Sequence, residues 1–231
     1  MIVTNEDLHI LRSGLQQLEL PADDEQVDWH CRYIRELQLW NRRVRLISGG
    51  PRDIIIRHIL DSLAPWKLLR REMERFGGSR AVVSIADVGS GNGFPALVLA
   101  GLSIRGILPA ADYYLVERGA KKAAFLRSTA GLLGLFDAVQ VEETDVRQLR
   151  RRVDMVISRA FMPAGDAFSL LEPLLAADGG ELCFYSGRRD TIDAQLEKLP
   201  DERKLAVEIE PVRVPFLEEE RHLCRIYKPL R

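Results

Sequence analysis

The sequence of 231 residues is poor in cysteine. Its three cysteines, Cys31, Cys183 and Cys224, form no Cys-x-x-Cys pair and no cluster with the four histidines. This spacing supports neither a disulfide framework nor a zinc site, so we expect free, buried thiols and no bound metal. The chain also lacks an apolar run near the roughly 18 residues that cross a membrane, and its first residues lack the pattern of a secretion signal. We therefore expect a cytoplasmic protein without membrane contact.

An overall excess of charge is absent as well, because the net charge is only −1, yet the charges are unevenly distributed. Residues 1–28 carry seven acidic side chains and one arginine, whereas residues 29–75 carry eleven Lys or Arg against five Asp or Glu. Further basic stretches lie at 118–127 and 147–159. Each stretch alone is typical of a solvated helix face, but together on one surface they would suit a polyanion.

The first 76 residues have helical periodicity, and we expect them to form a helical cap of three helices. Thr4 or Asn5 can cap the first helix, Asp23 and Asp24 the second, and Pro51 suits the first turn of the third. The sequence Gly77-Gly78 then breaks the pattern. We expect residues 77–231 to form the second domain, packed with the cap as one compact unit.

Short apolar runs alternate with helical segments after this break, which predicts an α/β fold with a parallel, Rossmann-like sheet and helices on both faces. Two strand-like runs at the end, Leu205–Val214 and His222–Lys228, have no helix between them, so we expect an antiparallel hairpin at the edge of the sheet. The expected parallel strands are Ala81–Asp87, Tyr113–Glu117, Val139–Val141, Val153–Ser158 and Glu181–Tyr185.

A glycine-rich turn follows the first expected strand. Gly89, Gly91 and Gly93 allow a sharp turn and leave room for backbone amides to approach a ligand, and the following helix N-terminus favours negative charge. Ligands of open parallel sheets bind at the carboxyl ends of the strands. A tight turn without a ligand would produce the same glycines, so the motif alone is weak evidence.

The spacing around this turn favours S-adenosylmethionine over a nicotinamide cofactor. A dinucleotide site prefers Gly-x-Gly-x-x-Gly, whereas the third glycine here comes one position early. Glu117, at the end of the second strand, can accept hydrogen bonds from both hydroxyls of a ribose. The sequence contains no Gly-x-x-x-x-Gly-Lys-Ser/Thr motif, which argues against an NTPase.

Four separated motifs resemble those of the bacterial glucose-inhibited division protein B family, the guanine-N7 methyltransferase of 16S ribosomal RNA. The resemblance extends to the sequence Glu-Arg-His-Leu at 220–223 and so covers nearly the whole chain. The motifs are Trp40-Asn41 followed by Leu-Ile-Ser at 46–48, Arg-His-Ile-Leu-Asp-Ser at 57–62, Asp-Val-Gly-Ser-Gly-Asn-Gly-Phe-Pro at 87–95, and Val-Ile-Ser-Arg-Ala at 156–160.

This resemblance implies a class I methyltransferase with an antiparallel last strand, S-adenosylmethionine at the carboxyl edge, and transfer of a methyl group to a guanine in the decoding-region loop of 16S rRNA. It implies that Gly89, Phe94, Asp145 and Val146 contact the cofactor, and that Arg159 contacts the cofactor or RNA and is the candidate catalytic residue. The spacing argument above adds Gly91 and Glu117 to the expected cofactor site. The expected RNA-binding residues are Arg42, Arg43, Arg45, Lys121, Lys122 and Arg188.

Several of these residues have a structural alternative. Asp145 could equally cap a helix, and His58 and Asp61, three residues apart on one helical face, suit a structural or RNA-positioning role better than acid-base catalysis. Guanine N7 carries no proton, so its methylation needs alignment more than a general base. We expect Trp29, Tyr33 and Trp40 to serve in packing rather than base stacking.

The sequence departs from the family pattern at two positions. Ala96 replaces a glycine common after Phe-Pro, and Ser186-Gly187 replaces a usual Lys-Gly, so that the positive charge moves to Arg188.

Two other functions remain open: a nicotinamide-dependent oxidoreductase, and a methyltransferase-like module that binds RNA or a nucleoside without turnover. The expected partner is 16S rRNA, the small ribosomal subunit or its precursor, and we expect a monomer.

Overall fold

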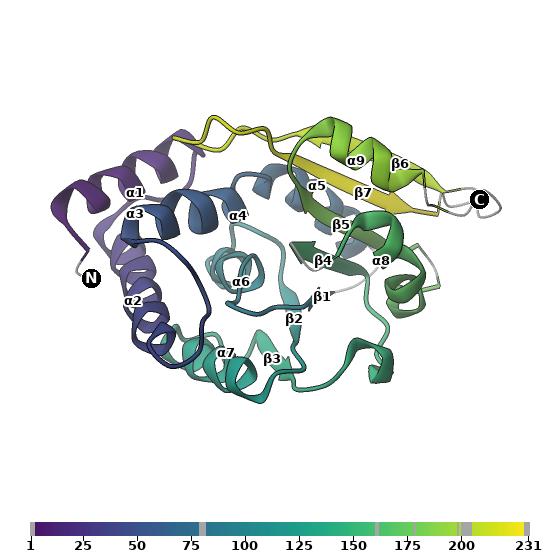
Figure 1. Ribbon diagram of the computed structural model, residues 1–231, viewed down its shortest axis with the longest axis horizontal. Helices are drawn as coiled ribbons and strands as arrows, with labels where there is room; N and C mark the ends of the chain where they lie inside the picture. The colour runs from purple at the N-terminus through teal and green to yellow at the C-terminus, as the bar shows by residue number, and fades with distance from the viewer. Residues whose placement is uncertain are drawn as a thin grey trace.

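A computed structural model describes residues 3–78, 82–159, 162–177, 179–197, 199 and 205–228. A seven-stranded sheet of order β3-β2-β1-β4-β5-β7-β6 lies at the centre of these residues (Figure 1). Strands β1 to β5 pair in parallel, whereas β7 pairs antiparallel with both β5 and β6. The bounds are Val83–Val88 for β1, Ala111–Val116 for β2, Val139–Glu142 for β3, Met155–Arg159 for β4, Glu181–Ser186 for β5, Ala206–Pro211 for β6 and His222–Tyr227 for β7.

Helices cover both faces of the sheet because each central strand is apolar on both sides. Ile85 of β1 packs into one core with α5 (Trp66–Gly77), α6 (Ala96–Ile104) and α7 (Ala120–Leu132). Its neighbour Ala86 faces a second core. That core contains α8 (Ala164–Leu171) and α9 (Arg189–Leu196), which Figure 1 shows across the strands from α6 and α7. Alternation of side chains along the strands therefore produces the three layers.

The helical cap begins as expected but contains more helix than expected. Thr4 caps α1 (Asn5–Gln17), Asp23 caps α2 (Asp24–Asn41), and Pro51 begins α3 (Pro51–Ile54). The third helix then continues through a π-helix, Ile55–Leu60, into α4 (Asp61–Leu63). The expectation of three helices was wrong, because α5 follows after Pro65, where a proline can begin a new helix as well as end one. Helix α9 was also not expected.

Aromatic side chains of the cap pack against α7 and the glycine turn. The indole N–H of Trp29 donates to the Leu133 carbonyl at 3.1 Å, and the Tyr33 hydroxyl donates to the Asn92 carbonyl at 2.7 Å. Trp40 lies edge-on to Phe125 of α7, with 5.9 Å between the ring centroids. The packing role expected for these three aromatic residues is confirmed, and buried cap residues share one apolar core with the sheet.

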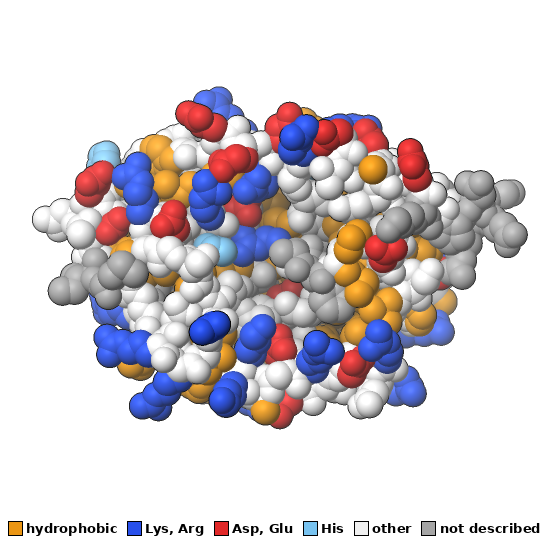
Figure 2. Space-filling model, in the orientation of Figure 1, with side chains coloured by type: hydrophobic (Ala, Val, Ile, Leu, Met, Phe, Trp, Pro, Cys, Tyr) orange, Lys and Arg blue, Asp and Glu red, His pale blue; other side chains and the backbone are white. Residues whose placement is uncertain are grey.

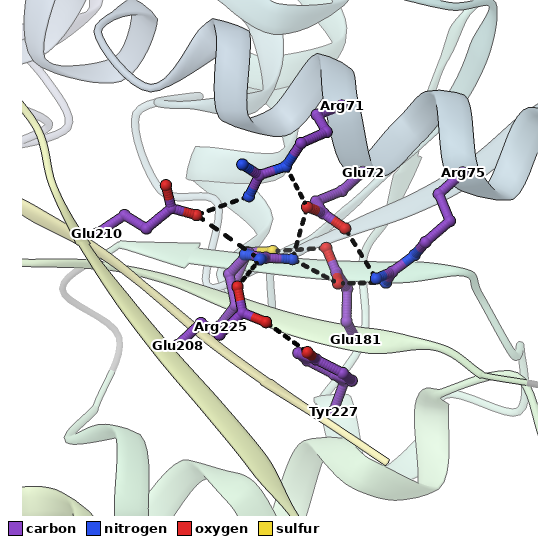
Figure 3. Close-up of polar contacts among 9 residues, drawn as sticks. Arg71, Glu72, Arg75, Glu181, Glu208, Glu210, Arg225 and Tyr227 are labelled. Atoms are coloured by element: carbon purple, nitrogen blue, oxygen red, sulfur yellow. Dashed lines mark hydrogen bonds and ion pairs between the residues drawn. The ribbon is translucent and has the colours of Figure 1, made fainter. Parts of the chain in front are cut away.

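A buried charge network joins α5 to the last strands (Figure 3). Arg225 of β7 is 2% exposed and pairs with Glu72 of α5 at 2.8 Å and with Glu181 of β5 at 3.3 Å. It also contacts Glu208 and Glu210 of β6. Glu181 begins β5, so this network lies at the opposite end of the strand from the glycine turn. It connects the antiparallel edge to α5, away from the candidate site.

The expected α/β class, with its N-terminal helical cap and antiparallel last strand, is confirmed. The three cysteines are free and buried, as expected. Within the described ranges there is no group of His, Cys, Asp or Glu suited to a metal ion, and no helix long and apolar enough to span a membrane. Ala81, the first residue of the expected first strand, and Ala160, in the fourth motif, lie outside the described residues.

Candidate active site

The glycine turn connects β1 to α6 through backbone conformations that other residues adopt with strain. Gly89, Gly91 and Gly93 have φ angles of 77°, 51° and 84°. A Cβ atom at Gly93 would lie 2.4 Å from Leu97 Cδ1 and 2.6 Å from the Tyr33 hydroxyl. At Gly91 the nearest atom to such a Cβ would be the Gly89 carbonyl oxygen at 3.5 Å. Gly93 is therefore required by packing, whereas a Cβ at Gly91 would make only an ordinary van der Waals contact.

Glu117 ties this turn to the next strand. It follows β2 directly, is 8% exposed, and its carboxylate accepts hydrogen bonds from the backbone N–H groups of Gly91 at 3.1 Å and Gly119 at 2.7 Å. Two oxygens offer more acceptor positions than these two bonds use. The carboxylate is therefore held rigidly and can still accept from a ligand hydroxyl.

A hollow of about 440 Å³, here the Glu117 hollow, opens beside this carboxylate. Gly89, Asp145 and Val146 line it together with Glu117, so four of the expected cofactor residues meet in one place. Asp145 also caps a 3-10 helix, Val146–Gln148, by accepting from the Arg147 N–H at 2.9 Å. Asp145 therefore both caps the 3-10 helix and lines the Glu117 hollow.

Asp87, on β1 just before the turn, carries an unusual carboxyl group. It is 1% exposed, and its Oδ2 has no hydrogen-bond partner within the described part of the chain. Burial raises its pKa to about 7, against a smaller lowering by a hydrogen bond from Ser90 and the charge of Arg159. A buried carboxyl with a vacant acceptor atom is costly for the folded protein alone, which is typical of a group that serves a ligand.

Arg159, at the end of β4, is held by three groups from the cap. Its guanidinium donates to Asp61 Oδ2 at 2.9 Å, to His58 Nδ1 at 2.7 Å and to the Arg57 carbonyl at 3.2 Å. It also lies over the ring of Phe94, 5.5 Å from the centroid. Its side chain is only 13% exposed. The cap thus fixes the orientation of this arginine at the carboxyl edge of the sheet.

His58 is a neutral acceptor in this arrangement. Burial, followed by the charge of Arg159, lowers its pKa to about 3. Because arginine has no acceptor, the His58 Nδ1 must accept from Arg159. The ring also stacks on Phe94 at 5.5 Å. His58 lies in the π-helix, a distortion frequent at functional sites.

Asp61 binds a second arginine that the sequence analysis did not single out. Its Oδ1 accepts from Arg221 Nε at 3.0 Å, while its Oδ2 accepts from Arg159. Asp61 is 7% exposed, so its charge compensates two guanidinium groups in a site with little water. Arg221 belongs to the Glu-Arg-His-Leu sequence at 220–223, and this motif could have identified it as a candidate site residue.

A larger cleft of about 630 Å³, here the Arg159 cleft, adjoins these groups. Its walls include Arg159, Arg221, Tyr185 and His222, which come from the ends of β4, β5 and the segment leading into β7. Met162 lines both this cleft and the Glu117 hollow, so the two spaces are neighbours. Gly91 and Phe94 line neither space, and Phe94 is buried, with an exposure of only 3%.

The expected RNA-binding residues of the cap lie on the loop between α2 and α3. Arg42, Arg43 and Arg45 are exposed and form no ion pair with any described residue. Asn41 shapes this loop, since its side chain accepts from the Leu46 N–H at 2.7 Å and donates to the Ile47 carbonyl at 2.8 Å. The Asn41 of the Trp-Asn…Leu-Ile-Ser motif therefore holds the loop in shape through the backbone of the Leu-Ile part of the motif.

The remaining expected basic residues differ in their surroundings. Lys121 is exposed near the start of α7, and Lys122 lines the Glu117 hollow. In Figure 2, Lys and Arg side chains predominate along the lower edge, over α7 and the segments beside it, whereas acidic and basic groups mix along the upper edge. Arg188 follows β5 at the rim of the Arg159 cleft, where Asp190 pairs with it through a 3.1 Å bond. Its charge is therefore partly neutralised.

Known proteins with similar sequences agree with the cofactor site inferred from the geometry. A family model described as rRNA small subunit methyltransferase G, GidB, matches residues 27–224. The ribosomal RNA small subunit methyltransferase G of Bordetella pertussis is 36% identical over 216 residues, which cover 92% of this chain and 90% of that protein. The protein of the same name from Geobacter sulfurreducens is 31% identical over 222 residues, covering 94% and 95%.

Solved structures share the fold at low identity. A SAM-dependent O-methyltransferase from Thermotoga maritima aligns with a TM-score of 0.52 at 16% identity, covering 86% of this chain and 72% of that one. A ribosomal protein L11 methylase from Lactobacillus delbrueckii subsp. bulgaricus aligns with a TM-score of 0.52 at 17% identity, covering 80% and 83%. These alignments assign the sheet and its helices to the class I methyltransferase fold.

Proposed function

The chain belongs to the family of rRNA small subunit methyltransferase G, and from this premise we propose that it transfers a methyl group from S-adenosylmethionine to guanine N7 in the decoding-region loop of 16S rRNA. The observation that carries the proposal is the meeting of Gly89, Glu117, Asp145 and Val146 around one hollow beside a cleft that holds Arg159.

The residues present fit the cofactor. Glu117 has acceptor positions left for ribose hydroxyls, and Asp145 can accept from an adenine amino group. Asp87 has an unpartnered buried oxygen that suits a cationic donor. When bound, S-adenosylmethionine supplies an electrophilic methyl group on a sulfonium centre. Family membership argues against the nicotinamide-dependent alternative, and these acceptors are consistent with that.

The side chains of this site align the reactants rather than move protons. Guanine N7 presents a lone pair without a proton, so the nucleophile needs no general base. His58 is unprotonated near neutral pH and its Nδ1 is occupied by Arg159. The Arg159 cleft is large enough for a purine base, and we assign it to the target guanine. Arg159, held from three sides, would then position the base or its phosphate against the methyl donor.

The neighbouring basic surface would hold the RNA around the base. Arg42, Arg43, Arg45 and Lys121 are exposed and not neutralised by any described acidic side chain, which is the condition for phosphate binding. Arg188 would contribute less, because Asp190 already pairs with it.

The test incubates the purified protein with radiolabelled S-adenosylmethionine and, separately, small subunits, protein-free 16S rRNA and large subunits. Label in small-subunit RNA, with strand cleavage specific for 7-methylguanine at one decoding-region position, is the expected result. Cofactor binding without label would instead identify the non-catalytic module. Transfer confined to a base atom other than N7 would contradict the proposed specificity.

A further inference from the structure

Four arginines lie within six residues of the chain between β3 and β4, beside the site assigned above. Arg147, Arg150, Arg151 and Arg152 are all exposed, and they surround a hollow of about 420 Å³, here the Arg150 hollow. Apolar side chains such as Leu149 complete its lining. The hollow thus combines an apolar floor with a dense cationic rim.

The charges on this rim are unevenly compensated. Arg147 pairs with Asp145 at 3.3 Å, and Arg151 reaches Glu142 only at 3.5 Å while its guanidinium stacks 3.9 Å from the ring centroid of Tyr114. Arg150 donates to a backbone carbonyl, that of Arg147, at 3.1 Å. Neither Arg150 nor Arg152 forms an ion pair within the described ranges.

Some exposed arginines of the cap helices differ in this respect, because they pair with acids: Arg52 with Glu6 at 2.9 Å, and Arg70 with Glu74 at 2.7 Å. Uncompensated arginines at one place favour an anionic partner, because their mutual repulsion is relieved only by such a partner.

The Arg150 hollow adjoins the candidate active site. Val146, Arg147 and Leu170 line both this hollow and the Glu117 hollow, and Met162 lines both the Glu117 hollow and the Arg159 cleft. The Glu117 hollow therefore has the cleft assigned to the target base as one neighbour and the hollow with the four arginines as another. A single nucleic acid strand extending from the target base past the cofactor hollow would reach these arginines.

We propose that Arg150 and Arg152 bind phosphates of the RNA strand that flanks the methylated guanine, so that the RNA contacts the protein on both sides of the cofactor hollow. This inference rests on the proposed function and extends its RNA surface to the sheet face covered by α8. Phosphate is the occupant that fits, because guanidinium groups bind it in a bidentate manner and single strands expose it at every nucleotide.

The experiment compares the double variant Arg150→Gln/Arg152→Gln with Arg52→Gln/Arg70→Gln, which removes the same charge from paired, exposed positions. Methyl transfer to small subunits and binding to a protein-free 16S rRNA fragment are measured at several salt concentrations, with thermal unfolding and cofactor affinity as folding controls. Neither Arg150 nor Arg152 lines the Glu117 hollow, so cofactor affinity is expected to stay unchanged.

For the first variant we expect KM for the subunit to rise about tenfold with kcat unchanged, roughly 0.7 kcal/mol for each contact. The slope of log affinity against log salt for the RNA fragment should fall by about 1.4, as two phosphate contacts on a single strand require. The control variant should match the wild type in both.

An unchanged KM and salt slope in an active enzyme would overturn this inference and leave the proposed function standing. A higher KM for the subunit with unchanged binding to protein-free RNA would assign the surface to a ribosomal protein, which also overturns it. Absence of transfer by the wild-type protein would instead refute the proposed function.

Discussion

Replacement of Asp87 by asparagine tests the cost of keeping this carboxyl buried, and its proposed role in cofactor binding. The folded pKa is about 7, whereas the ordinary value for an unfolded aspartate is 3.8. The folded protein therefore binds the proton more tightly than the unfolded chain, and this carboxyl contributes less stability as the pH rises from about 4 to about 7. Above that range the loss is complete.

The size of the effect follows from these two values. Between pH 5 and pH 8 the carboxyl lowers the free energy of unfolding by about 2.5 kcal/mol. Asparagine does not titrate, so the Asp87→Asn variant should gain about this amount relative to the wild type over the same interval. Any penalty for burying the new amide group is the same at both pH values and cancels in the comparison.

The assay is urea unfolding of both proteins without cofactor at pH 5 and pH 8, with binding of S-adenosylmethionine measured by calorimetry at pH 8. We expect the variant to become the relatively more stable protein at pH 8 and to bind the cofactor more weakly, by about tenfold or more for a lost charge-assisted bond. If the stability difference is the same at both pH values, Asp87 is ionised in the folded protein and the reasoning fails.

Four further substitutions, one of them a control, test other parts of the site and fold. Gly91→Ala and Gly106→Ala place a Cβ at φ angles of 51° and 70°, the latter in open space, and both should lose about 1 to 2 kcal/mol of stability. Calorimetry should show weaker cofactor binding only for Gly91→Ala, because strain at Gly91 disturbs the N–H that holds the Glu117 carboxylate. Arg159→Ala should reduce single-turnover methylation more than cofactor affinity, and wild-type values for both would make this arginine a surface charge. Arg225→Met removes one of two arginines that pair with both Glu72 and Glu181, and Arg75 remains, so urea unfolding should show a loss of about 1.5 to 3 kcal/mol; a change under 1 kcal/mol would mean that Arg75 alone compensates the two carboxylates.

The sequence by itself determined the features that depend on neighbours along the chain. Periodicity identified the strands, because a buried parallel strand needs a nearly continuous apolar run. Local rules also located the glycine turn, the caps at Thr4 and Asp23, and the hairpin at the end. Helix α5 escaped these rules, since Pro65 marks both the end of one helix and the start of another.

The tertiary structure alone decided which distant side chains act together. Asp61 is 98 residues from Arg159 and 160 residues from Arg221 along the chain, yet its one carboxylate joins both guanidinium groups. No periodicity records that pairing, because it arises where the cap, β4 and β7 meet at the carboxyl edge of the sheet. The same is true of the buried Arg225, whose acidic partners come from α5, β5 and β6. Charge compensation depends on distance in space, so only the folded chain distinguishes an arginine held within a site from one left free to bind a phosphate.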